Sequence, residues 1–281
     1  MRIVQVSDTH LSHRGGITNR NYERLITFIN EDLQPDLVVH SGDVVILDPD
    51  SAADRAAALE LSAMITAPLR VVPGNHDVGE PGDRPWGGLS ATSARVAAFT
   101  SAYGPDHWLE IVGGYAVIGL NSEILSTGLP EEQAQWDWLG SITGQVGTRP
   151  ALVFCHKPIW SPVPGPADGA LSIPDAQRDR LLEALAGVDV KVYANGHLHH
   201  FAIGRQGRAL TVTAPSTSFA ARSHDDLAGH GLQQAGVVEY QCEAGGVEVY
   251  FRSVPGLTEG SPIDVEQFVT AAAELGVTFG A

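Results

Sequence analysis

The chain of 281 residues is 43% hydrophobic and 18% charged, a composition that is typical of globular proteins and excludes a largely disordered chain. Its 17 Lys and Arg against 33 Asp and Glu give a formal charge of −16, which argues against binding to a nucleic acid polymer or an anionic membrane. With only Cys155 and Cys242, a disulfide framework is excluded as well.

The first residues, MRIVQVSD, soon reach a carboxylate and lack the basic and then apolar segments of a signal peptide. We expect them to form the first strand. No run in the sequence approaches the roughly 18 apolar residues of a membrane span. These features predict a cytoplasmic protein.

Short runs rich in Val and Ile alternate with segments of helical spacing. Runs that are apolar on both faces predict strands buried between two layers, and the alternation predicts an α/β layered fold. Ser51 is a candidate N-cap, and Pro130 and Pro174 suit the first turns of helices. The expected strands are Ile3–Val6, Leu37–Val39, Leu69–Val72, Tyr115–Leu120, Ala151–Phe154 and Val190–Tyr193. The expected helices are Arg20–Asp32, Ser51–Thr66, Ala91–Ala102, Glu131–Leu139 and Pro174–Ala186.

After His200 the pattern favours strands, with Gly245-Gly246 as a hairpin turn. These strands are Ala209–Ala214, Ala235–Tyr240 and Val247–Val254, and a helix follows at Ile263–Leu275. We predict a catalytic domain over residues 1–256, in which 201–256 complete the fold and could form a cap or dimer region. Residues 257–281 are a C-terminal extension, which could dock on the domain or pack against another subunit.

Five polar segments each follow directly on an apolar run. In α/β folds this places them in loops at strand ends, where ligands gather. Their glycines would let the backbone turn sharply and approach a ligand closely. The segments are Asp8-Thr9-His10, Gly42-Asp43, Gly74-Asn75-His76-Asp77, His156 and Gly196-His197-Leu198-His199.

These segments carry the ligands of a metal site. Residues at i and i+2 in extended backbone point to one side, so Asp8 with His10, and His197 with His199, would each converge. Carboxylate, imidazole and amide ligands together suit Fe, Mn, Zn or Co, and suit neither an all-oxygen calcium site nor a thiolate zinc site. Asp43 stands alone in its segment and is the candidate for a carboxylate that bridges two cations.

The ordered set resembles the calcineurin-like metallophosphoesterase superfamily, whose pattern is D-x-H, G-D, G-N-H-[DE], H and G-H-x-H. The resemblance covers Met1 to Ser216. The stretches VSDTHLS, VVPGNHD, NGHLHH and TVTAPSTS are most similar to the cyclic-nucleotide (class III) and glycerophosphodiester phosphodiesterases of that superfamily. The fold that this resemblance implies is a four-layer αββα sandwich of two packed mixed sheets.

The resemblance also implies two metal ions per chain and a role for each motif residue. One ion would be held by Asp8, His10, Asp43 and His199, and the other by Asp43, Asn75, His156 and His197. His76 would face the phosphate as the catalytic histidine, with Asp77 holding its ring, and Asn75 would also contact substrate.

The implied reaction is hydrolysis by a hydroxide that bridges the two metals. Two cations about 3.5–4 Å apart would clamp the phosphoryl oxygens and activate the water between them. His76 would stabilise the developing charge or protonate the leaving group.

Residues near the motifs have roles that the sequence leaves open. His13 and Arg14 are candidates for substrate contact, and Lys157 either meets the phosphate or sits on the rim. His200 is expected to point away from the metals and His40 to be a core or supporting residue. Further candidates for substrate contact are His224 and His230. Trp86 and Trp160 either belong to the core or stack on a base or lipid, and Cys155 is expected to pack as an apolar residue.

Two departures narrow the substrate class. Ile46 stands where purple acid phosphatases have a ligand tyrosine, so their charge-transfer colour is not expected. The arginine that follows the same aspartate in Ser/Thr protein phosphatases is missing, which argues against phosphoprotein substrates.

We therefore expect hydrolysis of a small phosphodiester, such as a 3′,5′-cyclic nucleotide or a glycerophosphodiester. A phosphomonoesterase and a nucleotide pyrophosphatase are the alternatives, and a non-catalytic scaffold is a remote one. Specificity is expected to lie in the loops Pro81–Gly88, Ser161–Gly169 and Ala221–Gln234. The oligomeric state is open, with a homodimer as one outcome.

Overall fold

The first three apolar runs and the last two form a mixed sheet of five strands in the order β11-β10-β1-β2-β3. A computed structural model describes the chain except residues 83–85, 163–168, 220–230, 245, 262–264 and 278–281. In this sheet β1, β2 and β3 are parallel, while β10 runs antiparallel to both β1 and β11. The strands are β1 (Arg2–Val6), β2 (Leu37–His40), β3 (Leu69–Val71), β10 (Val237–Glu243) and β11 (Gly246–Arg252).

A second mixed sheet has six strands in the order β4-β5-β6-β7-β9-β8. Its four central strands are parallel, and the edge strands β4 and β8 are antiparallel to their neighbours. The strands are β4 (Trp108–Val112), β5 (Tyr115–Gly119), β6 (Pro150–Phe154), β7 (Asp189–Asn195), β8 (Ala202–Gln206) and β9 (Ala209–Thr213).

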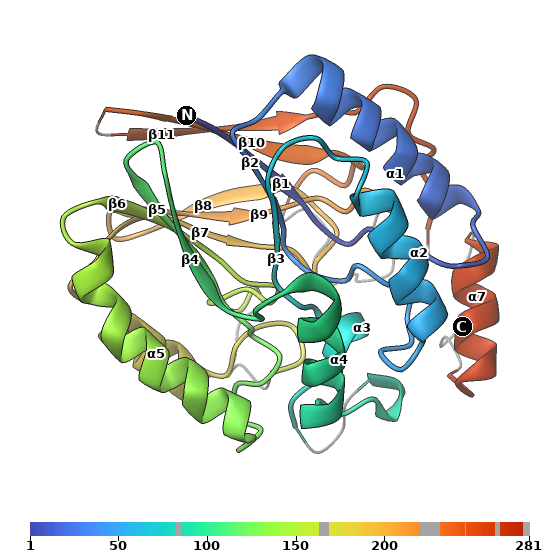
Figure 1. The fold of residues 1–281 in the computed structure, drawn as a ribbon, viewed down its shortest axis with the longest axis horizontal. Helices are drawn as coiled ribbons and strands as arrows, with labels where there is room; N and C mark the ends of the chain where they lie inside the picture. The colour runs from blue at the N-terminus through green and yellow to red at the C-terminus, as the bar shows by residue number, and fades with distance from the viewer. Residues whose placement is uncertain (83–85, 163–168, 220–230, 245, 262–264, 278–281) are drawn as a thin grey trace.

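The two sheets pack face to face, and helices cover their outer faces. Val39, Leu152 and Tyr240 belong to the fully buried cluster between the sheets. Figure 1 shows α5 (Pro130–Val146) on one side of the sheets, with α1 (Ile17–Phe28) and α2 (Ala52–Ser62) on the other. The predicted four-layer αββα sandwich is therefore confirmed.

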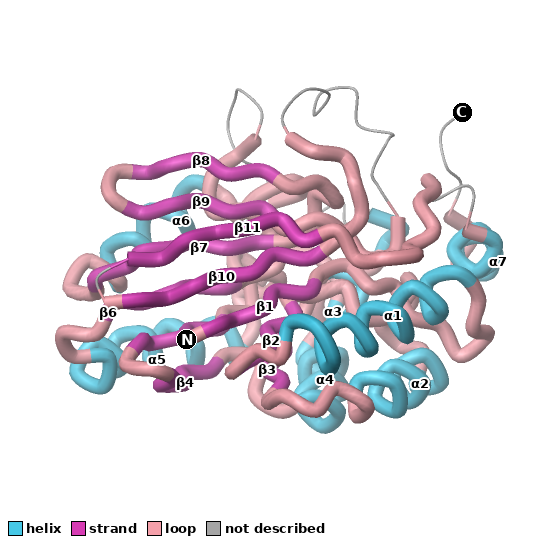
Figure 2. The backbone as a smooth tube through the Cα atoms, turned by 90° about the horizontal axis from the view of Figure 1, so that it is seen from above, coloured by secondary structure: helices cyan, strands magenta, loops and turns pink. Residues whose placement is uncertain are grey.

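The remaining helices are α3 (Asn75–Val78), α4 (Ser93–Tyr103), α6 (Asp175–Ala184), α7 (Glu266–Glu274), the π-helical turn Ile29–Leu33 and the 3₁₀ turn Trp86–Gly88. Of these, α4 and α6 also pack on the outer faces of the sheets. Figure 2 shows α6 and α7 at opposite ends of the molecule. Among the described helices, none combines the length and the apolar character that crossing a membrane requires.

Local signals placed several helix ends correctly. Ser51 caps α2, where its hydroxyl accepts the N–H of Asp54 at 3.2 Å, and Pro130 is the first residue of α5. Pro174 stands one residue before α6. The prediction for α5 ended too early, at Leu139. The helix continues through Gly140 and Gly144 because Ile142 and Val146 extend its apolar face and are fully buried.

Two strands were not predicted. β4 joins β5 through Gly113-Gly114, whose positive φ values of 55° and 84° suit a tight hairpin turn, so a signal for this strand was present. β8 has little apolar pattern because it is an exposed edge strand. β10 and β11 form the expected hairpin, although Gly245 of its turn lies outside the described residues.

The C-terminal extension docks on the domain through α7. Phe268, Ala271 and Ala272 of this helix are buried in a cluster with Ile46 and Phe219. Burial of one large apolar side chain contributes about 1.5–3 kcal/mol, so this cluster holds the end of the chain beside the loops at the strand ends.

Candidate metal centre

The five predicted motif segments meet at one edge of the sandwich. They follow β1, β2, β3, β6 and β7, which are parallel strands within their sheets, so their loops leave the sheets at the same edge. Backbone hydrogen bonds join these loops directly: Asp8 N–H donates to Gly42 O at 3.0 Å, and Gly196 N–H donates to His156 O at 2.9 Å. The tertiary fold thus gathers segments that are far apart in the sequence.

The first group of ligand atoms comes from Asp8, His10, Asp43 and His199, all within 4.8 Å of one another. His199 Nε2 lies 3.2 Å from both Asp8 Oδ1 and His10 Nε2. His10 Nε2 lies 3.9 Å from Asp43 Oδ2. Donors about 2.0–2.2 Å from one ion stand roughly 3–3.6 Å apart, so most of these spacings suit a single cation.

The second group comes from Asp43, His156 and His197. His156 Nε2 lies 3.3 Å from Asp43 Oδ2, 3.2 Å from His197 Nδ1 and 3.0 Å from Asn75 Oδ1. Asn75 therefore belongs with this group, as the resemblance implied. Asp43 is common to both groups, which is the arrangement that a bridging carboxylate requires.

Each of the four imidazoles in the two groups has one ring nitrogen bound to a backbone carbonyl. This bond fixes the tautomer and leaves the other nitrogen to face the group, the usual arrangement of histidine metal ligands. The pairs are His10 Nδ1 to Ile46 O (3.1 Å), His156 Nδ1 to Ser41 O (2.8 Å), His197 Nε2 to Ala170 O (2.8 Å) and His199 Nδ1 to Phe219 O (3.0 Å). Asp8 Oδ1, which is buried, has no well-aligned hydrogen-bond donor. The donor set thus fits two cations.

The backbone at these residues corrects one sequence argument. Asp8, His10, Asp43, His197 and His199 all have positive φ, between 48° and 68°. The paired ligands therefore converge through left-handed backbone and not through the extended backbone that we expected. Such conformations are uncommon for residues other than glycine, although Asp and His tolerate them better than most. Concentrated strain of this kind is characteristic of functional sites.

The motif glycines allow close packing of the loops, as predicted. A Cβ atom on Gly42 would stand 2.6 Å from His156 Nδ1. A Cβ on Gly74 would overlap Asp43, and one on Gly196 would overlap the Ser7 side chain. Alanine at any of these positions would displace a ligand or its support.

Burial and the charges of neighbouring side chains set the protonation of the residues in the two ligand groups. Burial raises the pKa of Asp43, but His156, His76 and His10 outweigh it and hold that pKa well below its usual range. Burial and His76 lower the pKa of His10 to about 3. Burial alone would lower the pKa of His156, but Asp43 and Asp8 raise it to about 10. The ring of His156 accordingly faces oxygen acceptors on both sides.

Comparison with known proteins agrees with this geometry. The family model for calcineurin-like phosphoesterases matches residues 1–201. The chain belongs to the calcineurin-like phosphoesterases. The predicted family and its class, the metal-dependent phosphoric ester hydrolases, are thereby confirmed.

Curated relatives of this phosphoesterase carry different names. The "Probable cyclic nucleotide phosphodiesterase" of Rhodococcus erythropolis is 26% identical, over 98% of this chain and 91% of that protein. The "3',5'-cyclic adenosine monophosphate phosphodiesterase CpdA" of Pseudomonas aeruginosa is 29% identical over 79% of each chain. The "Serine/threonine-protein phosphatase CPPED1" of Danio rerio is 28% identical over 73% of this chain.

This chain spans only 66% of the zebrafish protein and 59% of its bovine counterpart. Among solved structures, a dimetal phosphatase from Danio rerio has a TM-score of 0.61 at 12% identity, covering 90% of this chain and 96% of that one. At this identity the likeness shows the fold alone.

Asp77 holds a loop of this phosphoesterase, not the His76 ring as expected. Its carboxylate accepts the N–H groups of Gly74, Val44 and Val45 at 2.8–3.2 Å. The ring Nδ1 of His76 instead donates to Leu47 O at 3.3 Å. Burial and the charge of Asp43 raise the pKa of Asp77 to about 7 despite its backbone bonds. Asp77 therefore fixes the turn that carries Asp43.

His13 and Arg14, the candidates for substrate contact, both bind protein partners. The backbone N–H and ring Nδ1 of His13 both bind Asp54 Oδ1, at 2.8 and 2.7 Å. Arg14 Nη2 binds Glu274 of α7, at 2.7 and 3.0 Å from its two oxygens. Both side chains thus tie the first motif loop to neighbouring helices.

The remaining residues whose roles the sequence left open are either buried, partly exposed or outside the described residues. As expected, His40 is buried and binds Thr9 Oγ1 at 2.9 Å, and His200 is buried with Nδ1 bound to Leu198 O at 3.1 Å. Cys155 is also buried. His224, His230 and the side chain of Trp86 lie outside the described part of the chain. The side chain of Trp160 is half-buried.

Two features of the site were missed from the sequence. Ser216 Oγ and Ser218 Oγ both donate to the carbonyl of Asp8, at 2.8 and 2.7 Å, and so support its left-handed backbone. The quoted stretch TVTAPSTS contains them, so this signal was available. Phe268 of α7 packs against His10, with ring centroids 6.0 Å apart, and nothing in the local sequence indicates this contact.

Lys157 is buried and so does not lie on the rim. Its side chain is 1% exposed, and Nζ lies 3.3 Å from Glu123 Oε2 and 3.8 Å from Glu80 Oε1. Nζ also donates to Gly169 O at 2.6 Å. The next carbonyl, of Ala170, is the one that orients His197. Lys157 thus ties the loop of His156 to the segment that holds His197.

We expect Lys157→Met to weaken metal binding at the second group about 10- to 100-fold, the usual effect of losing support for a ligand. It should also lower the free energy of unfolding by about 3–5 kcal/mol, because Glu123 is left buried and unpaired. The double variant with Glu123→Gln should recover stability but not metal affinity. Calorimetric metal titration and urea unfolding measure the two effects.

Lys191→Met is the matched control, since Lys191 is the only other lysine and pairs with Asp189 at the surface. It should leave both quantities unchanged. Wild-type metal affinity in Lys157→Met would show that the buried lysine does not position the second group.

Metal binding at the second group should release about one proton between pH 7 and 9. His156, with its pKa raised to about 10, is protonated there, and a metal must replace the proton on Nε2. Affinity should therefore rise with pH up to about 10. In chelated protein, the charge of His156 contributes to the free energy of unfolding. This contribution is complete below pH 6.5 and is lost as pH rises through about 10. Calorimetry in buffers of different ionisation enthalpy counts the protons; zero release at pH 8 would contradict a charged His156.

Proposed function

We propose that the chain hydrolyses small phosphodiesters with two metal ions that share Asp43. The observation that carries this proposal is the pair of ligand groups meeting at one buried carboxylate. When bound, the two ions would supply positive charge for the phosphoryl oxygens and lower the pKa of water between them. The ligand set suits Fe, Mn, Zn or Co, and availability decides among them.

The residues around the ions have distinct tasks. The backbone N–H of His76 donates to Asp43 Oδ1 at 2.8 Å and so orients the shared carboxylate. His76 itself belongs to neither ligand group. Because its Nδ1 binds Leu47 O, Nε2 is the nitrogen that can pass a proton to the leaving oxygen. Its side chain is 11% exposed, so substrate can reach one side of the ring.

Phosphodiesters are favoured by relatives with phosphodiesterase names, one of which aligns with 98% of this chain. Ile46, in the position of the purple acid phosphatase tyrosine, is buried in the apolar cluster with α7 and cannot supply a phenolate ligand. A phosphomonoesterase is the second candidate, because the relatives named CPPED1 are called phosphatases. Parts of the three loops expected to set specificity lie outside the described residues.

Chelation should abolish turnover of bis(p-nitrophenyl) phosphate, and Mn²⁺ or Co²⁺ should restore it. Asp43→Asn should lose both metal content and turnover, since it weakens both groups at once. Asp189→Asn, a surface carboxylate, is the control. A screen of cyclic nucleotides, glycerophosphodiesters and monoesters by kcat/KM then ranks substrates. A monoester as best substrate would favour the second candidate, and a metal-loaded protein without turnover would leave only a binding scaffold.

His76→Ala should lower turnover of a cyclic nucleotide by about 10²–10⁴-fold, the usual contribution of a general acid. The loss should be much smaller on a p-nitrophenyl ester, whose leaving group needs no proton. Metal content should remain near that of the wild type because His76 is not a ligand. His107→Ala is the control, since His107 belongs to neither ligand group and its ring binds Asp106 and packs against Trp138. An equal loss on both substrates would rule out the proton-donor role.

A further inference from the structure

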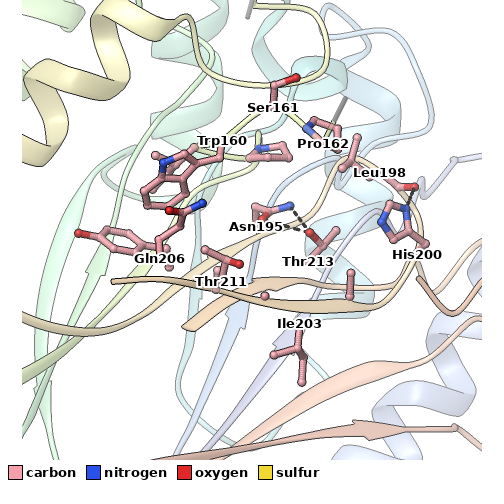
Figure 3. Close-up of a pocket in the computed structure, with 16 residues that line it drawn as sticks. Trp160, Ser161, Pro162, Asn195, Leu198, His200, Ile203, Gln206, Thr211 and Thr213 are labelled. Carbon is pink, nitrogen blue, oxygen red and sulfur yellow. Dashed lines mark hydrogen bonds between the residues drawn. The ribbon is translucent and has the colours of Figure 1, made fainter. Parts of the chain in front are cut away.

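A hollow of about 280 Å³ lies on the outer face of the second sheet, because Tyr193 and Thr211 line it while the alternating Val192 and Val212 are buried between the sheets. Figure 3 shows Trp160 and Gln206 near one end of it, and His200 and Leu198 near the other. Its floor is formed by side chains of β7, β9 and β8, and the loop from Pro158 to Pro162 forms one wall.

This hollow lies behind the loop that carries two metal ligands. Along residues 196–200, His197 and His199 belong to the ligand groups, whereas Leu198 and His200 line the hollow. Leu198 and His200 are buried, and His200 Nδ1 binds Leu198 O, so this wall is well defined. None of the described residues that line the hollow belongs to a ligand group, so the hollow and the metal centre share this loop but not their lining residues.

The lining carries no formal charge from Asp, Glu, Lys or Arg among the described residues. In a chain with 50 such residues (17 basic plus 33 acidic), this described lining argues against a site built for phosphate. A charged ligand would lose hydration here without a countercharge, which is costly. The hollow suits an uncharged molecule.

The floor offers hydroxyl and amide groups in a fixed pattern. β-Sheet register places Tyr193 beside Thr211 and Asn195 beside Thr213. Asn195 Nδ2 bonds Gly196 O at 2.9 Å and Thr213 Oγ1 at 3.2 Å, which holds that end rigid. On β8 the small residues Ala202 and Gly204 face Thr213 and Thr211, and their size leaves the hollow open.

Aromatic rings complete the hollow. The rings of Trp160 and Tyr193 meet edge to face, with centroids 5.2 Å apart and planes at 74°. The indole is half-buried, and Figure 3 shows it beside the Gln206 amide. A planar ligand can stack on an aromatic wall while its edge meets hydroxyl and amide groups, a combination that recurs in recognition of nucleobases.

We propose that this hollow is a binding site for an uncharged planar molecule with hydrogen-bonding edges, of the size and chemistry of a nucleobase or nucleoside. The site is distinct from the metal centre and does not depend on the proposed phosphodiesterase activity. Trp160 supplies the stacking surface, and Thr211 and Gln206 supply the polar edge.

The test titrates adenosine into chelated and into Mn²⁺-loaded protein, followed by calorimetry and ligand-observed NMR. One adenosine should bind per chain in both forms with a Kd below about 1 mM. Trp160→Leu should weaken binding roughly tenfold or more, the effect of losing one stacking ring. Trp138→Leu is the matched control, because Trp138 lies on α5 against His107. It should bind like the wild type.

Thr211→Val keeps the shape of the side chain and should weaken binding several-fold, which gives a second variant if Trp160→Leu unfolds. Adenosine monophosphate should bind chelated protein no more tightly than adenosine, because the described lining residues include no Lys or Arg. Absence of binding up to about 1 mM would overturn the proposal. Loss of binding on chelation, or equal affinity in all variants, would place adenosine elsewhere and overturn it as well.

Discussion

The carboxylate of Asp43 joins the two halves of the metal centre. Its Oδ2 lies 3.3 Å from His156 Nε2 and 3.9 Å from His10 Nε2, while Oδ1 accepts the N–H of His76. A buried carboxylate is stable only with compensating charge and hydrogen bonds. In metal-free protein the charged His156 supplies this compensation, and bound cations would take its place. Proton and metal therefore compete for one place, which links metal affinity to pH.

Gathering Asp43 and the six other candidate ligand residues in one place requires backbone that most residues avoid. Five of the seven have positive φ, and conformations of this kind cost of order 1–3 kcal/mol each. Hydrogen bonds from the surrounding loops offset the strain. Ser216 and Ser218 hold the carbonyl of Asp8, and Asp77 holds the two N–H groups that follow Asp43. The tight packing at Gly74 and Gly196 leaves the ligand loops little freedom to relax.

Support for the centre also comes from outside the motifs. Lys157, buried among two carboxylates, connects the His156 loop to the carbonyl that orients His197. On another side, α7 places Phe268 against His10 and receives Arg14 at Glu274. Behind the loop of His197 and His199, the uncharged hollow offers a separate surface. The loops at the strand ends are therefore fixed from several directions at once.

The sequence by itself indicated the family, the layered fold and the candidate ligands, because each candidate ligand follows an apolar strand and the order of motifs is highly specific. Before His200, local periodicity also placed six of the eleven strands in the described part of the chain, together with five helices. The paired ligands converge as expected, but by left-handed backbone, which no sequence spacing reveals. The roles of Asp77, Arg14 and Lys157 were decided by tertiary contacts alone. Arg14 meets a glutamate 260 positions away, and Lys157 finds carboxylates on two other loops. Local pattern records which residues can bind a metal, whereas their orientation depends on neighbours that only the folded chain brings together.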